Sequence, residues 1–437
     1  MQALIGPLQE LAEFEAIQKE KQKEAGVLQI SGCVNSQKTH MMYALGDGCK
    51  YRVIACSSES KARQVYEEYH MLDSETYFYP AKDFLFYQAD IRSKELQESR
   101  MTVVQAILEE KPLTVVVSFD AFMDALPVKG AMKDRVIRIE NGQTLDFDEI
   151  RKALTENGYD REEQVDGPGQ FAIRGGILDI YPLTGELPVR IELWGDEVDS
   201  IRSFDTDSQR SVQNLDEAVI YPADELPGRP VKRGSFLEYF PPEDTLVFLD
   251  EPARLVEKGE AVEQEFVEAQ AKRVESGYEV SDDEMELYET AEIVKRMNTY
   301  YCIGLSALDT HGNGFRFRNK FSINTKSVNP YNNSFETLTR DLKRLKRNDY
   351  RVILLSGSRT RAKRLAEDLR DYNLSSYYSE EQDREVQPGE IMTAYGHVAE
   401  GYEYPMLKFT VISETDIFGK VRKKRKRKKY EGRKIRD

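Results

Sequence analysis

The segment Gly32–Thr39 has the spacing of a phosphate-binding loop. Its sequence, GCVNSQKT, follows the pattern G-x-x-x-x-G-K-[ST] and lies between a predicted strand and a predicted helix. In such a loop, backbone N–H groups surround a phosphate, the lysine contacts the outer phosphates and the hydroxyl coordinates Mg²⁺. Lys38 and Thr39 are present. The second glycine is replaced by Gln37, whose side chain stands where the backbone must approach phosphate closely.

A second acidic segment has the form that such a loop needs as its partner. Residues 246–251, LVFLDE, are four apolar residues followed by two acids, as in a Walker B strand. The predicted degenerate nucleotide-binding loop therefore consists of Gly32, Gln37, Lys38, Thr39, Asp250 and Glu251. We favour an inherited fold without nucleotide turnover, and the alternative is a nucleotide-binding or weak ATPase unit. We expect no catalytic residue and no cofactor for this chain.

Residues 163–212 alternate apolar and polar side chains with period two, which predicts a small antiparallel meander. Turns are expected at Gly175-Gly176, at 184–188 and at Gly195-Asp196. Trp194, the only tryptophan of the chain, lies beside a turn and four residues after Arg190, and Arg174 is on a neighbouring strand. Arginine and tryptophan on one sheet face are typical of a protein-binding hot spot. The alternative is that Trp194 belongs to the core and that an arginine stem covers it.

The elements around these residues predict an α/β protein of several domains. Apolar runs at 27–31, 51–57, 76–79, 113–119 and 245–250 alternate with helical patterns, as in a parallel sheet covered by helices. Residues 335–419 repeat this alternation in a second small α/β domain. Residues 1–24 are helical in composition, and residues 322–334 have the composition of a linker. An aromatic cluster could be core or a base-stacking platform, with core favoured: Tyr77, Phe78, Phe84, Phe86 and Tyr87.

Charge and composition restrict the function further. The net charge is −15, but residues 420–437 carry +10, which leaves −25 for the rest of the chain. A body this acidic does not favour non-specific duplex binding, whereas the basic tail is either a flexible linker or a nucleic-acid-binding segment. No apolar run is long enough for a bilayer, so we expect a cytoplasmic protein without a membrane partner. The spacing of four cysteines predicts reduced thiols, and four scattered histidines predict no metal site.

The meander also resembles a known family. Its segments PGQFAIRGGILDIYPLT, RIELWGDEVDSIRSFD and SQRS are similar to the second domain of the UvrB homology module in bacterial transcription-repair coupling factors, the Mfd family. The resemblance extends over about 420 residues. It implies that this domain binds UvrA and that the family's contact positions fall on Arg174, Arg190 and Trp194. Pro252-Ala253-Arg254 follow the Walker B-like segment, where the related UvrB has Ser-His, so the coupling residues of a helicase are missing.

The resemblance also implies a domain plan and partners. The plan is a degenerate helicase-like domain in two halves at 1–125 and 223–334, a UvrA-docking domain at 126–222, a small α/β domain at 335–419 and a basic linker at 420–437. The family acts in nucleotide excision repair, in which it recruits UvrA to RNA polymerase stalled at DNA lesions. Its ATP- and Mg²⁺-dependent translocase and its polymerase-binding and DNA-binding regions have no counterpart here, so we expect a non-catalytic adapter that is a fragment of a longer protein.

Overall fold

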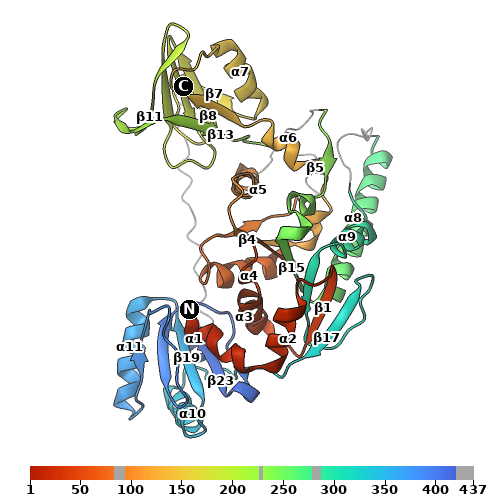
Figure 1. Ribbon diagram of the computed structural model, residues 1–437, viewed down its shortest axis with the longest axis vertical. Coiled ribbons are helices and arrows are strands. Elements are labelled where there is room, and N and C mark those ends of the chain that lie inside the picture. The colour runs from red at the N-terminus through yellow and green to blue at the C-terminus, as the bar shows by residue number, and fades with distance from the viewer. Residues whose placement is uncertain (83–93, 226–229, 278–286, 420–437) are drawn as a thin grey trace. The chain divides into compact units, whose positions relative to one another are not determined.

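The computed structural model describes residues 1–82, 94–225, 230–277 and 287–419 (Figure 1). The chain forms two compact units, and each is described here by itself. One unit contains residues 12–33 and 38–323, and the other contains residues 1–11, 34–37 and 324 onward.

The larger unit contains a seven-stranded sheet in which all neighbouring strands are parallel. The order is β17-β1-β16-β15-β2-β4-β3. Its strands are β1 (Gly26–Ser31), β2 (Tyr51–Cys56), β3 (Thr76–Tyr79), β4 (Leu113–Ser118), β15 (Thr245–Asp250), β16 (Tyr301–Leu305) and β17 (Phe317–Ser322). Strands β4 and β15 are buried along their whole length, as expected for continuous apolar runs covered on both faces.

Helices that come before and after the antiparallel meander in the sequence pack against this parallel sheet. Helices α2, α4, α5 and α8 contact its strands, and the shared core contains Val53, Val115 and Val247. The helices and short strands of this unit are α2 (Ala12–Glu20), α3 (Asn35–Leu45, whose first turn groups with the other unit), α4 (Glu59–His70), α5 (Lys94–Leu108), η3 (Phe119–Phe122), β5 (Leu126–Pro127), α6 (Lys129–Lys133), β14 (Arg233–Gly234), η4 (Phe236–Tyr239), η5 (Pro242–Asp244), α8 (Pro252–Glu275) and α9 (Thr290–Met297).

The inserted segment forms a six-stranded, mainly antiparallel sheet with the order β12-β11-β10-β9-β8-β7. Its elements are β7 (Asp160–Arg161), β8 (Gln170–Arg174), β9 (Ile177–Tyr181), β10 (Val189–Trp194), β11 (Glu197–Phe204) and β12 (Ser211–Leu215). Helix α7 (Phe147–Glu156) and the pair β6 (Ile137–Glu140) and β13 (Glu217–Ile220) accompany it. One face packs on a core that contains Leu178, Ile191 and Ile201, which leaves the other face for polar residues.

The smaller unit contains a mixed six-stranded sheet with the order β18-β22-β23-β19-β21-β20. Its elements are α1 (Gln2–Ile5), η1 (Gly6–Glu10), β18 (Lys326–Ser327), α10 (Phe335–Arg347), β19 (Arg351–Ser356), α11 (Arg359–Asp371), β20 (Tyr377–Tyr378), β21 (Ile391–Tyr395), β22 (Tyr402–Tyr404), η6 (Pro405–Leu407), β23 (Phe409–Ser413) and α12 (Glu414–Phe418). Helices α10, α11 and α12 pack against this sheet.

The structure confirms the predicted α/β class, the parallel sheet and the antiparallel meander. Two local predictions were only partly right. The segment 322–334 is not simply a linker, because β18 pairs with β22 in the smaller sheet. The helical segment 1–24 is interrupted: Pro7 lies in the 3₁₀ turn η1, and Leu11 is extended before α2 begins. The domain boundaries inferred from the resemblance remain predictions.

Candidate partner-binding site

Trp194 lies at the tip of the β10–β11 hairpin and is 84% exposed to solvent. Gly195, at φ +68°, makes the tight turn that follows it. The β8–β9 hairpin ends beside it, because the Leu193 N–H donates to the Gly176 carbonyl at 2.8 Å. The alternative that Trp194 belongs to the core is therefore wrong. An indole this exposed gives the fold no burial energy, which is the property expected of a contact residue.

Arg174 and Arg190 meet on the outer face of the same sheet, at one buried carboxylate. Asp179 on β9 stands directly opposite Arg190 on β10, and both lie on the face turned away from the main core. Arg190 Nε and Nη2 donate to the two carboxylate oxygens of Asp179 at 2.7 and 2.8 Å, which is a bidentate pair. Arg174 Nη2 donates to Asp179 Oδ2 at 2.9 Å. A single aspartate therefore fixes both predicted contact arginines.

The two arginines differ in their exposure and in how many hydrogen bonds they already make within the protein. The Arg190 side chain is 12% exposed, lies 4.2 Å above the Phe204 ring centroid and also donates to Gln209 Oε1 at 2.8 Å. Its hydrogen bond to Asp179 raises the pKa of Arg190, so its charge is secure. The Arg174 side chain is 45% exposed and makes only the single bond to Asp179 within the described part of the chain.

Two other charged residues of this face are paired with each other. Arg202 on β11 donates to both carboxylate oxygens of Glu192 on β10, at 2.5 and 3.2 Å. Ser200 Oγ also donates to Glu192, at 3.3 Å. The accessible groups of the face include the Trp194 indole and the outward edges of Arg174 and Arg190. This combination can bind an apolar side chain together with a carboxylate.

Sequence reasoning missed three residues that build this site: Asp179, Phe204 and Gln209. All three lie within the family-like segments of the meander, and period two places Asp179 and Arg190 on the polar face of their strands. The signal that could have found Asp179 is an acid on the polar face of a strand next to one that carries an arginine. Gln209 comes from the loop after β11, and no pattern in the sequence indicates its position.

The charged residues of the predicted nucleotide-binding loop lie close together. They are paired with one another. Lys38 Nζ lies 2.8 Å from Asp250 Oδ1 and 2.5 Å from Glu251 Oε1, and its side chain is 7% exposed. Burial lowers the pKa of Lys38, but the charge of Asp250 and the hydrogen bonds to both acids outweigh it and raise the pKa overall. Thr39 Oγ1 donates to Glu68 Oε2 at 2.7 Å. The groups that would contact phosphate and Mg²⁺ already have protein partners.

Three N–H groups at the start of the loop also have acceptors within the protein. The N–H groups of Gly32 and Cys33 donate to the carbonyls of Ala307 and Ser306 at 3.2 and 3.0 Å. The Val34 N–H donates to Oε1 of Gln37 at 3.1 Å, so the side chain that replaces the second glycine supplies the acceptor that a phosphate would supply. Gly32 has φ +82°, and a Cβ there would lie 1.9 Å from the Ile323 carbonyl oxygen. Backbone packing therefore requires this glycine without any ligand.

Other predicted features give no competing site. The four cysteines are buried and unpaired. The described residues contain no cluster of three His, Cys, Asp or Glu side chains that could hold a metal ion, and none of their helices is long and apolar enough to cross a membrane. Tyr77 and Phe78 are half-buried on β3, whereas Phe84, Phe86, Tyr87 and the basic tail 420–437 lie outside the described residues.

Comparison with known proteins gives a family match for the domain that contains the antiparallel sheet. Residues 137–226, which contain the whole Trp194 hairpin, match the family described as UvrB interaction domain. The chain is also similar to transcription-repair-coupling factors, as its sequence indicated. That of Bacillus subtilis strain 168 is 28% identical over 416 residues, and that of Staphylococcus haemolyticus is 25% identical over 415 residues. Each alignment covers 82% of this chain and 35% of the relative. The chain thus spans about a third of the length of these curated relatives.

Proposed function

We propose that this protein docks UvrA through the outer face of its antiparallel sheet and that it acts as a non-catalytic adapter. The observation that carries the proposal is the 84% exposure of Trp194 on a rigid hairpin, within the domain that matches the UvrB interaction family. Trp194 is the apolar anchor. Arg174 and Arg190 supply charge-assisted hydrogen bonds to acidic side chains of UvrA.

The contacts of Asp179 refine the roles of the two arginines. Arg190 uses Nε and Nη2 inside the protein, and its Nη1 group donates no hydrogen bond within the described residues. Arg190 therefore reaches UvrA with one edge, while its other edge sets its position. Arg174 has Nε and Nη1 available and is the more exposed of the two. Because both side chains are held before binding, little conformational entropy is lost when UvrA docks.

A calorimetric titration of the chain with UvrA tests this proposal. Trp194→Ala should weaken binding at least tenfold, which corresponds to about 1.4 kcal/mol, and Arg174→Ala should weaken it less. Val212→Ala is the matched control, because Val212 is an exposed apolar residue on β12 of the same sheet. This control should bind like the wild type. Absence of binding by the folded wild type, or full affinity of Trp194→Ala, would contradict the proposal.

The name of the relatives, transcription-repair-coupling factor, supports a wider role. We propose that UvrA docking links nucleotide excision repair to RNA polymerase stalled at DNA lesions. Contacts with polymerase and DNA, and ATP-driven translocation with Mg²⁺, would belong to the parts of the longer relatives that this chain does not cover. A pull-down of stalled transcription complexes by the chain alone should therefore fail, while UvrA capture succeeds.

For the loop Gly32–Thr39 we propose a structural role. The internal partners of Val34, Lys38 and Thr39 support it, because a nucleotide would have to displace all of them. Titration with a fluorescent ATP analogue and Mg²⁺ tests the alternative of a nucleotide-binding unit. Saturable binding that is lost in Lys38→Ala, with the variant still folded, would establish that alternative and overturn the structural role.

A further inference from the structure

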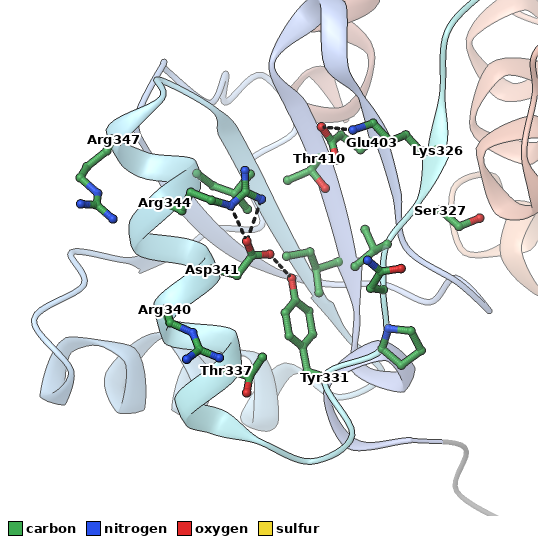
Figure 2. Close-up of a pocket in the computed structure, with 15 residues that line it drawn as sticks. Lys326, Ser327, Tyr331, Thr337, Arg340, Asp341, Arg344, Arg347, Glu403 and Thr410 are labelled. Carbon is green, nitrogen blue, oxygen red and sulfur yellow. Dashed lines mark hydrogen bonds and ion pairs between the residues drawn. The ribbon is translucent and has the colours of Figure 1, made fainter.

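Helix α10 and the edge of the smaller sheet enclose a groove of about 580 Å³ that the proposed function does not use. Figure 2 shows the arrangement: Arg340, Arg344 and Arg347 project from α10, and Lys326 and Ser327 lie across the groove on β18. Tyr331 and Thr410 lie between these two walls. All of these residues belong to one compact unit.

The carboxylates of this groove are already neutralised. Asp341 accepts from Arg344 Nε at 2.8 Å and from the Tyr331 hydroxyl at 2.7 Å. Glu403 accepts from the Tyr350 hydroxyl at 2.8 Å, and Lys326 Nζ lies 3.6 Å from it. Asp341 and Glu403 are therefore already paired within the groove and do not neutralise its other arginines.

Two arginines of the groove remain without a carboxylate partner among the described residues. Arg340 makes no ion pair there, and Arg347 makes only a bond from Nε to the Lys343 carbonyl at 3.3 Å. The helix dipole accounts for cations in the last turn of α10, but Arg340 lies about two turns earlier. Arg340 and Arg344 are also like charges at i and i+4, which disfavours the helix. Stability of the helix therefore does not explain Arg340.

The lining favours one class of occupant. The groove has apolar residues in its floor and rim, Leu345, Ile412, Val328 and Pro330, beside its arginines. It has no exposed aromatic side chain for stacking bases, because Tyr331 is buried and its hydroxyl is bonded to Asp341. Over residues 324–419, which contain the groove, acids slightly outnumber Lys and Arg, so this described part of the unit has no excess of cations to favour phosphate binding.

We propose that this groove docks an acidic polypeptide segment of a partner protein, with an apolar side chain on the floor and carboxylates on Arg340 and Arg347. The two arginines lie seven residues apart on one face of α10, about 10 Å along the helix axis. Carboxylates on one face of an acidic helix repeat at the same spacing. Guanidinium forks bind carboxylates in a planar, bidentate geometry, which gives the contact orientation as well as charge.

Fluorescence anisotropy with the full chain tests this interface. The probe is a short fluorescein-labelled peptide in which glutamates flank leucines, and its counterpart carries glutamine in place of glutamate. The wild type should bind the glutamate peptide at least tenfold more tightly than the glutamine peptide. The double variant Arg340→Glu/Arg347→Glu should lose at least tenfold in affinity for the glutamate peptide.

The matched control is Lys343→Glu/Lys346→Glu, which makes the same change of charge on the same helix at two positions that do not line the groove. It should retain affinity, and both variants should melt like the wild type, because the four side chains make no ion pairs among the described residues. Equal loss in both variants, or equal binding of the two peptides, would overturn the proposal. So would a single-stranded oligonucleotide that binds through Arg340 and Arg347 while the peptide does not.

Discussion

Lys38 and Trp194 belong to the same unit, but they differ in how much of their bonding capacity the protein itself uses. Lys38 is buried against two acids, and the backbone around it donates to carbonyls and to Gln37. Trp194 contributes almost nothing to the fold and stands in solvent. The segment with the clearer chemical motif is thus internally satisfied, whereas the segment with no catalytic motif presents unused contact area.

This contrast shows why a motif alone does not identify a site. A phosphate loop requires free N–H groups, a free lysine and a free hydroxyl, and each of these can be diverted by one neighbouring acceptor. A docking surface requires exposed apolar area on a rigid support, which a folded chain has no internal reason to retain. Substitutions in the two regions should therefore separate stability from binding.

The largest expected effect is that of Lys38→Ala on stability. Removal of the ammonium leaves Asp250 buried and unpaired beside Glu251, which should lower the free energy of unfolding by about 3 kcal/mol. Urea denaturation measures this change. Affinity for UvrA should stay within about twofold of the wild type, because the lysine pairs with Asp250 and Glu251 and shares no partner with the Trp194 hairpin among the described residues.

A second variant checks the cause of that loss. Lys38→Ala combined with Asp250→Asn and Glu251→Gln should recover part of the stability, since no uncompensated charge then remains. If the triple variant is less stable than the single one, packing rather than charge pairing explains the role of Lys38.

Asp179→Asn should reduce both stability and UvrA binding, because Asp179 is a buried group that also positions the binding arginines. The substitution leaves Arg190 with a neutral partner and should cost about 2 kcal/mol of stability. UvrA affinity should fall as well, in spite of the absence of a direct contact. Titrations at a temperature where the variant is fully folded distinguish the two effects. Unchanged affinity there would show that Asp179 does not position the arginines.

Gln37→Ala should have a smaller effect, confined to the loop. It removes the acceptor of the Val34 N–H and the donor to the Tyr404 hydroxyl, a bond of 2.9 Å, and should cost about 1–2 kcal/mol. Thermal unfolding measures this loss. Gln37→Glu keeps an acceptor but places a carboxylate at a fully buried position, so it should be at least as destabilising as Gln37→Ala. Full stability of Gln37→Ala would show that the side chain does not hold the loop.

The smallest effect is expected for Arg202→Ala on the binding face. Its pair with Glu192 is partly exposed and joins neighbouring strands, so stability should change by less than about 1 kcal/mol. UvrA affinity should change less than for Arg174→Ala, because Arg202 is already engaged by both oxygens of Glu192. A loss equal to that of Arg174→Ala would extend the interface to β11.

The sequence predicted those parts of the fold that depend on local periodicity. The meander was found because its strands alternate, and β2, β4 and β15 were found because they are continuous apolar runs. β17 was missed because Arg318, Asn319 and Lys320 give it the polarity of an edge strand, and β18 was missed because it has only two residues. Period two does not reveal which acid pairs with which arginine, since cross-strand partners depend on register.

The position of β1 in the parallel sheet has a consequence for how the chain is made. β1 lies between β16 and β17, and Ser31 hydrogen-bonds to Phe321, which lies 290 residues later. At about 5–20 residues per second, a ribosome needs about 15–60 s to supply these neighbours after β1 emerges. The meander needs only local contacts and can form meanwhile, whereas the parallel sheet has the high contact order of slow folders. Nascent chains should therefore become competent for UvrA before the parallel sheet closes.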